Sequence, residues 1–181
     1  LPGLLLIKPK AHRDERGFFL ETWQLSRYQS LGVPEGSWAQ DNVSSSKKGV
    51  LRGLHFQFPR PQGKLITVLE GKVFDVAVDI RVGSPTFGKH LGFSLSGENL
   101  HQLWIPTGFA HGFLVLSDFA VVSYKTSDFY YPDDEKTLLW NDPVLSVAWP
   151  SLGEPPLVSQ KDKLGRPLGE FSQNELPQFE L

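Results

Sequence analysis

Residues 50–57 read Val50-Leu51-Arg52-Gly53-Leu54-His55-Phe56-Gln57 and combine strand-forming side chains with two basic ones. Apolar and aromatic side chains dominate it, which is typical of a β-strand. Strict alternation along a strand would put Arg52 and His55 on opposite faces, so we expect a bulge at Gly53 that turns both side chains inward. The stretch therefore predicts a strand that carries basic groups into a polar pocket.

The surrounding sequence repeats this β-rich pattern. Residues 73–80 alternate, so that Phe74, Val76, Val78 and Ile80 share one face and Asp75 and Asp79 share the other. Further strands are expected at residues 18–22, 38–44, 65–69, 89–95, 103–105, 112–116 and 120–127, and one short helix at residues 26–31. About ten short strands with Gly and Pro turns predict an all-β sandwich or barrel, and we expect a cupin-like jelly-roll barrel with short helical and irregular flanking segments. Exposed strand edges in such folds are often paired across a dimer, so the N-terminal strand is a candidate for crossing to a partner.

Composition narrows the class of protein further. A chain of 181 residues with 40% hydrophobic and 21% charged residues predicts a single globular domain over residues 1–181. The net charge of -2 argues against a general nucleic-acid binder. The absence of cysteine removes disulfides, thiolate metal ligands and cysteine nucleophiles. No apolar run approaches the roughly 20 residues that a membrane span needs, and we expect a cytoplasmic protein.

Two histidines raise the question of a metal site. Residues 106–111, Pro106-Thr107-Gly108-Phe109-Ala110-His111, resemble the second cupin motif, PxGxxH. The first cupin motif supplies two histidines as H-x-H, but here that place reads His55-Phe56-Gln57, so an amide replaces one ligand. Because His55, His111 and a carboxylate are enough ligands for a transition metal, a metal-dependent cupin enzyme stays an alternative.

A metal-free reading of the same residues uses acid–base chemistry. An imidazole such as that of His55 titrates near working pH and suits proton abstraction. Lys64 could supply the cation that stabilises an enolate, and the phenol of Tyr124 could return a proton from the opposite face. One base, one acid and one cation are the parts of an epimerase that acts beside a ketone.

Several motifs occur together and in order along the chain. They are Asp14-Glu15-Arg16-Gly17-Phe18-Phe19-Leu20-Glu21, Gln40-Asp41-Asn42, residues 50–55, Gln62-Gly63-Lys64, residues 74–79, residues 104–113, Tyr124-Lys125 and Leu139-Trp140-Asn141-Asp142-Pro143. This set closely resembles the dTDP-4-dehydrorhamnose 3,5-epimerase family over roughly residues 4–165.

The resemblance implies a fold, an activity and a set of roles. The family is a metal-free, cofactor-free, homodimeric jelly roll that acts on dTDP-4-keto-6-deoxy-D-glucose and inverts C3 and C5, giving the precursor of dTDP-L-rhamnose. His55 then matches the proton acceptor, Asp162 its carboxylate partner, Tyr124 the proton donor and Lys64 the lysine beside the keto oxygen. The implied substrate contacts are Arg16, Glu21, Gln40, Asp41, Asn42, Arg52, His111, Glu135 and Lys161, with Tyr130 stacking on thymine.

Other functions stay open at this point. Some relatives invert only C3, and the same base and acid would serve that reaction. A non-catalytic sugar-nucleotide binding module is a further class, although it would not require a base and an acid placed together.

Overall fold

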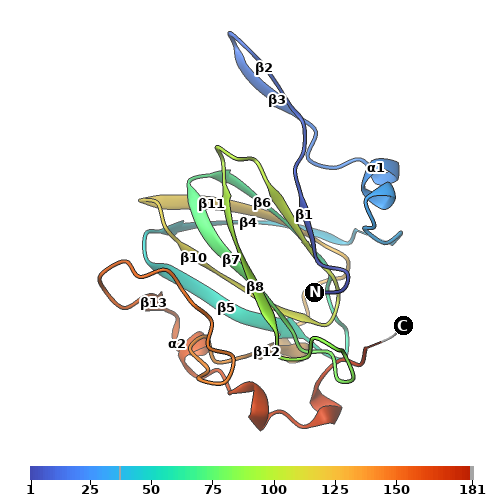
Figure 1. The fold of residues 1–181 in the computed structure, drawn as a ribbon, viewed down its shortest axis with the longest axis vertical. Helices are drawn as coiled ribbons and strands as arrows, with labels where there is room; N and C mark the ends of the chain where they lie inside the picture. The colour runs from blue at the N-terminus through green and yellow to red at the C-terminus, as the bar shows by residue number, and fades with distance from the viewer. Residues whose placement is uncertain (37, 180–181) are drawn as a thin grey trace.

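The computed structural model describes residues 1–36 and 38–179, and two facing β-sheets form its body (Figure 1). The five-stranded sheet has the order β1 (Leu5–Ile7), β9 (Gln102–Ile105), β6 (Lys64–Glu70), β11 (Phe119–Thr126) and β4 (Gln40–Lys47). The six-stranded sheet has the order β12 (Glu135–Thr137), β5 (Val50–Gln57), β10 (Phe109–Val115), β7 (Lys72–Asp79) and β8 (His90–Ser96), with β13 (Leu157–Val158) also pairing with β5. Every pairing between these strands is antiparallel except that of β13 with β5. The predicted all-β jelly roll is confirmed.

Four apolar clusters hold these layers together, and the smallest packs Val158 of β13 on Leu51 and Leu114. One lies between the two sheets and includes Ile66, Phe109 and Val122. A second covers the outer face of the six-stranded sheet, where Leu138, Leu168 and Phe171 of the C-terminal segment pack on side chains such as those of Leu54 and Val76. The third packs Tyr28 of helix α1 (Leu25–Ser30) and three tryptophans on the other sheet. The six-stranded sheet is therefore covered on its outer face, whereas the outer face of the five-stranded sheet is covered only in part, since Val43 on β4 is exposed.

Strand β7 shows how alternation distributes side chains. Val76 and Val78 point into the outer cluster, whereas Ala77 points between the sheets. Asp75 and Asp79 are both fully buried, but they bond to different groups. Asp79 accepts hydrogen bonds from Arg81, Ser84 and Thr86 and so closes the loop after β7.

The irregularity expected at Gly53 is present. Strand β10 pairs with β5 through His111 and His55 and then through Phe113 and Arg52, so the register shifts between these two pairs. Gly53 has a φ of +100°, a conformation that favours glycine. The shift is what lets Arg52 and His55 line the same cavity.

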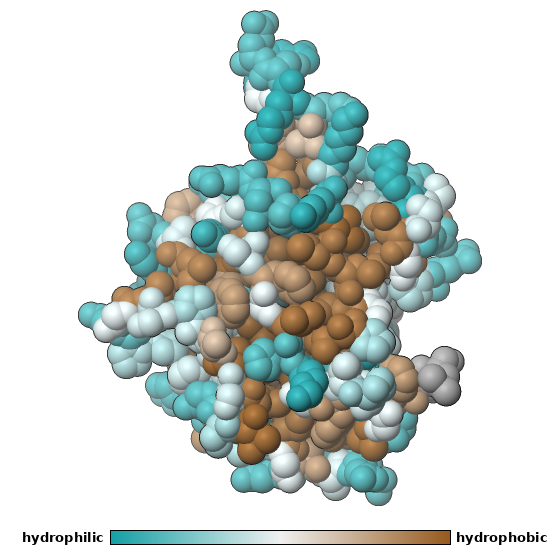
Figure 2. Space-filling view, viewed as in Figure 1, coloured by the Kyte–Doolittle hydropathy of each residue, from teal (hydrophilic) through white to brown (hydrophobic). Residues whose placement is uncertain are grey.

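A hairpin projects from the body at the top of Figure 1. Its strands are β2 (Ala11–Asp14), which the sequence pattern did not predict, and β3 (Gly17–Leu20). Phe18 and Phe19 are exposed, with 71% of Phe19 accessible. Figure 2 shows the hydrophilic tip of this hairpin above a face on which apolar side chains gather.

The remaining elements are short. The expected helix at residues 26–31 corresponds to α1, whose N-terminal amide of Arg27 donates to the Gln24 side chain. Helix α2 (Gln160–Lys163) and three single 3-10 turns, Pro132–Asp134, Leu168–Glu170 and Gln173–Glu175, lie in the proline-rich C-terminal part. No helix in residues 1–36 or 38–179 is long and apolar enough to cross a bilayer.

Candidate active site

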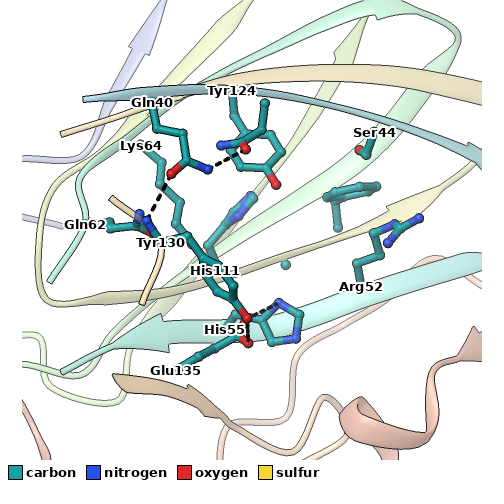
Figure 3. Close-up of a pocket in the computed structure, with 13 residues that line it drawn as sticks. Gln40, Ser44, Arg52, His55, Gln62, Lys64, His111, Tyr124, Tyr130 and Glu135 are labelled. Carbon is teal, nitrogen blue, oxygen red and sulfur yellow. Dashed lines mark hydrogen bonds and ion pairs between the residues drawn. The ribbon is translucent and has the colours of Figure 1, made fainter. Parts of the chain in front are cut away.

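A cavity of about 290 Å³ opens between the two sheets (Figure 3). Its lining is polar and draws on both sheets and on the loop after β11. The lining residues are Gln40, Asn42, Ser44, Arg52, His55, Gln62, Lys64, His111, Gly112, Phe113, Tyr124, Tyr130 and Glu135. A polar hollow inside an otherwise apolar core is the natural candidate for a ligand site.

His55 stands on β5 and is held by a carboxylate from far along the chain. Its Nε2 lies 2.5 Å from Oδ1 of Asp162, and the other Asp162 oxygen accepts the Gly53 amide at 3.2 Å. Burial acts to raise the pKa of Asp162, but its hydrogen bonds with His55, Gly53 and Ser159 outweigh burial and lower that pKa. Because an ionised carboxylate can only accept, Nε2 carries the hydrogen, and in the neutral imidazole Nδ1 is then left with its lone pair.

A second histidine–carboxylate pair lies directly beside the first. His111 is the register partner of His55, and its Nε2 lies 2.9 Å from Oδ2 of Asp75. Asp75 is fully buried and His111 is 8% exposed. Asp75 therefore supports the cavity from behind, and this pair is sealed from solvent more completely than the first.

Tyr124 and Lys64 reach the cavity from the opposite sheet. They stand on β11 and β6, and Figure 3 shows the Tyr124 phenol directed into the space above His55. Burial raises the pKa of Tyr124, and the nearby Arg52 guanidinium partly offsets this effect. Burial lowers the pKa of Lys64 to about 8, opposed by the carboxylates of Glu135 and Asp75. At neutral pH the phenol thus keeps its proton and the lysine keeps most of its charge.

Glu135 connects His55 to the mouth of the cavity. Its Oε1 lies 3.9 Å from Nδ1 of His55, and its Oε2 accepts hydrogen bonds from the Tyr130 hydroxyl at 2.7 Å and from the Lys161 ammonium. Burial acts to raise the pKa of Glu135, but the bonds from Lys161 and Tyr130 lower it overall. The Tyr130 amide also donates to Gln40 at 3.0 Å, which fixes this loop against β4.

Arg52 marks the opposite end of the cavity from Gln40 and Gln62 (Figure 3). Its Nε donates to Ser46 at 3.0 Å, which leaves the other guanidinium nitrogens for an anion. The site therefore has a cationic end at Arg52 and an acid–base centre at His55 and Tyr124.

Most predicted site residues lie at or behind this cavity, and three do not. Asp162 and Lys161 lie behind its wall, bonded to His55 and Glu135. Arg16 is on the projecting hairpin and pairs with Asp14, Glu21 pairs with Arg27, and Asp41 pairs with Lys125 on the outer side of its strand. Alternation explains Asp41, because Gln40 and Asn42 on either side of it face the cavity.

Ser44, Gln62, Gly112 and Phe113 also line the cavity although no role was predicted for them. Three of these positions could have been read from the sequence, since Ser44, Gln62 and Phe113 are each two residues from a predicted site residue on the same strand or its extension.

Where the first cupin motif would supply its second histidine, this chain has Gln57, whose side chain bonds to backbone groups. Gln57 donates to the carbonyls of Arg60 and Phe129 and accepts the amide of Tyr131, and it does not line the cavity. Across residues 1–36 and 38–179, no cluster of three or more His, Asp or Glu side chains is arranged to hold a metal ion.

These features define a cupin-like jelly roll that is equipped for acid–base chemistry on a bound ligand. The chain belongs to the dTDP-4-dehydrorhamnose 3,5-epimerase family, whose family model matches residues 1–170. A dTDP-4-dehydrorhamnose 3,5-epimerase of Pseudomonas aeruginosa is 49% identical over 92% of this chain and 91% of its own length.

Two further relatives show how much of each chain is similar. The crystal structure of a dTDP-6-deoxy-D-glucose-3,5-epimerase from Legionella pneumophila, in complex with dTDP-4-keto-L-rhamnose, is 50% identical, with a TM-score of 0.96 over 100% of this chain and 96% of the other. A dTDP-4-dehydrorhamnose 3,5-epimerase of Neisseria gonorrhoeae is 49% identical over 97% of this chain, which spans only 53% of the length of that relative.

Proposed function

We propose that this protein is a dTDP-4-dehydrorhamnose 3,5-epimerase, which inverts C3 and C5 of dTDP-4-keto-6-deoxy-D-glucose to give dTDP-4-keto-L-rhamnose for dTDP-L-rhamnose synthesis. One observation carries the proposal, namely that an oriented imidazole and a phenol from opposite sheets share one cavity with a lysine. Membership of the family and the identities of the relatives support the same activity.

The chemistry follows from the ketone at C4, which acidifies the hydrogens on both neighbouring carbons. Nδ1 of His55 takes a proton from one face, and the electrons of the broken C–H bond move to the C4 oxygen to form an enolate. Lys64 stabilises that oxygen, and a single well-placed donor of this kind is worth about 3–4 kcal/mol. Tyr124 then gives its proton to the carbon from the other face, and the acid–base pair adds about 10²–10⁴-fold in rate.

The rest of the cavity is proposed to hold the nucleotide sugar. The guanidinium of Arg52 suits a diphosphate, because it binds phosphate oxygens through paired hydrogen bonds. Tyr130 offers an aromatic face for thymine, while Gln40, Asn42 and His111 are proposed as further substrate contacts. Lys161 contributes through Glu135, to which it is bonded.

We also propose a homodimer, as expected from the sequence. Strands β1 and β8 are edge strands, and apolar side chains on them, Leu6 and Leu91, are exposed. The hairpin that carries Arg16 extends away from its own cavity, and its exposed Phe19 needs a surface to cover it (Figure 1). A partner copy would bury these side chains and bring Arg16 to a cavity other than its own. A cytoplasmic location belongs to the same proposal.

The test is to follow solvent deuterium into C3 and C5 of the substrate by NMR. The proposal predicts that both positions exchange and invert, and that a His55→Asn variant binds dTDP-sugar without exchanging either hydrogen. Label at C3 alone would instead identify a single inversion, and activity that is lost on chelation and restored by a metal would identify a metal-dependent enzyme.

A further inference from the structure

In the proposed double inversion, the first inversion leaves His55 and Tyr124 in the wrong protonation states for the second. After the first inversion, His55 carries one proton more than at the start and Tyr124 carries one fewer. Neither group can act on the second carbon until His55 has lost its proton and Tyr124 has regained one. A site that uses the same base and acid twice therefore needs a path by which the base is reset while the sugar stays bound.

The surroundings of His55 offer one such path. Its Nε2 is closed off by Asp162, which is 3% exposed, so a proton on that side has no outlet. Nδ1 faces the cavity, and the nearest carboxylate oxygen on that side is Oε1 of Glu135 at 3.9 Å. This gap is about 1 Å longer than a hydrogen bond, so a single water or a small rotation of the imidazole spans it.

Glu135 in turn is bonded to side chains that are exposed to solvent. Its second oxygen is held by the Tyr130 hydroxyl and the Lys161 ammonium, and the Tyr130 residue is 47% exposed while the Lys161 side chain is 52% exposed. These partners hold the carboxylate at the rim in its ionised form, and its lowered pKa means that it releases a proton to water rather than storing it. The neighbouring pair of His111 and Asp75 is buried and has no comparable exit.

We propose that Glu135 is the proton relay that resets His55 between the two inversions, an assignment that rests on the proposed double epimerisation. The proton on Nδ1 of the His55 imidazolium passes to the Glu135 carboxylate, and the resulting carboxylic acid gives it to bulk water. Tyr124, left as a phenolate, takes a proton from water through the cavity. One proton leaves and one enters, so the charge of the site is restored and no other reactant is consumed.

The test is a single-turnover exchange in D₂O with enzyme in excess over dTDP-4-keto-6-deoxy-D-glucose. In the Glu135→Gln variant the first carbon should exchange within about threefold of the wild-type rate, while exchange at the second carbon should fall at least about tenfold. A singly inverted, singly labelled sugar should then accumulate. Formate should restore the second exchange in Glu135→Ala, because a small acid can carry the proton in place of the missing side chain.

The control is Glu175→Gln, which removes a carboxylate that is likewise bonded to a cation, Arg166, but lies away from the cavity. It should exchange both carbons at wild-type rates. Equal slowing of both carbons in Glu135→Gln, or no slowing of either, would overturn the relay while leaving the epimerase assignment standing. If the wild-type enzyme itself failed to exchange both carbons, the proposed function would fail instead.

Discussion

Replacing Gly53 by alanine tests whether the irregular pairing of β5 with β10 is what builds the site. A methyl group on Gly53 would lie 2.5 Å from the carbonyl oxygen of His111 and 2.8 Å from Cα of Gly112. Both atoms belong to the backbone of the neighbouring strand, so no side-chain rotation relieves the contact. The residue also has a φ of +100°, which is strained for any L-amino acid with a side chain.

The expected loss of stability follows from these two costs. The left-handed conformation costs about 1–2 kcal/mol for a non-glycine residue, and overpacking costs about 1–3 kcal/mol. We expect Gly53→Ala to lower the free energy of unfolding by about 3–4 kcal/mol, which for a domain of this size lowers Tm by about 6–16 °C. The catalytic rate should fall by about 10–100-fold at a temperature where the variant is folded, because the Gly53 amide holds the carboxylate that orients His55.

Gly49→Ala is the matched control for this variant. Gly49 also has a positive φ, of +78°, but a methyl group there meets nothing within 4 Å. It should lose only about 1–2 kcal/mol, the cost of the left-handed conformation, and it should keep its activity. Urea unfolding followed by circular dichroism, with epimerase assays on the same samples, measures both effects. The reasoning is refuted if the two variants unfold within about 1 kcal/mol of each other, or if Gly53→Ala turns over at the wild-type rate.

Three further outcomes are expected. Tyr124→Phe should lower kcat by about 10²–10⁴-fold with binding of dTDP unchanged by calorimetry, and a wild-type kcat would remove the phenol from its role. Because the ammonium of Lys64 loses its proton above its pKa of about 8, the rate should decline above that pH, and Lys64→Arg should move the decline to higher pH; an unmoved profile would assign the decline to another group. Leu54→Ala, at a fully buried position under the C-terminal segment, should cost about 2–5 kcal/mol in urea unfolding, and a smaller loss would mean that this segment collapses onto the cavity left behind.

Much of the cavity could be predicted because strand residues alternate. Once β4 is recognised, Gln40, Asn42 and Ser44 must share a face, and Asp41 between them must point the other way. The same rule pairs His111 with Phe113 on β10. The break in alternation between Arg52 and His55 was also foreseeable, since glycine is the residue that most readily adopts the positive φ found at this position.

The partner of His55 could not be found in this way. Asp162 lies 107 residues further along the chain, on a helix of four residues that has no hydrophobic periodicity. What brings it to the cavity is the parallel pairing of the two-residue strand β13 with the start of β5, followed by the capping bond from the Asp162 amide to Ser159. Short-range patterns carry no information on such a contact, and only the family resemblance indicated it.

The hairpin that carries Arg16 shows a different limit of sequence analysis. Contacts within one chain do not explain why the aromatic side chains beside Arg16 are exposed. A two-stranded hairpin alone in water is only marginally stable, yet β2 and β3 carry Phe18 and Phe19 outward rather than onto their own body. At its tip, Arg16 pairs with the neighbouring Asp14. The proposed homodimer would account for both features, because a partner copy would cover the exposed aromatic side chains and would offer Arg16 a cavity other than its own.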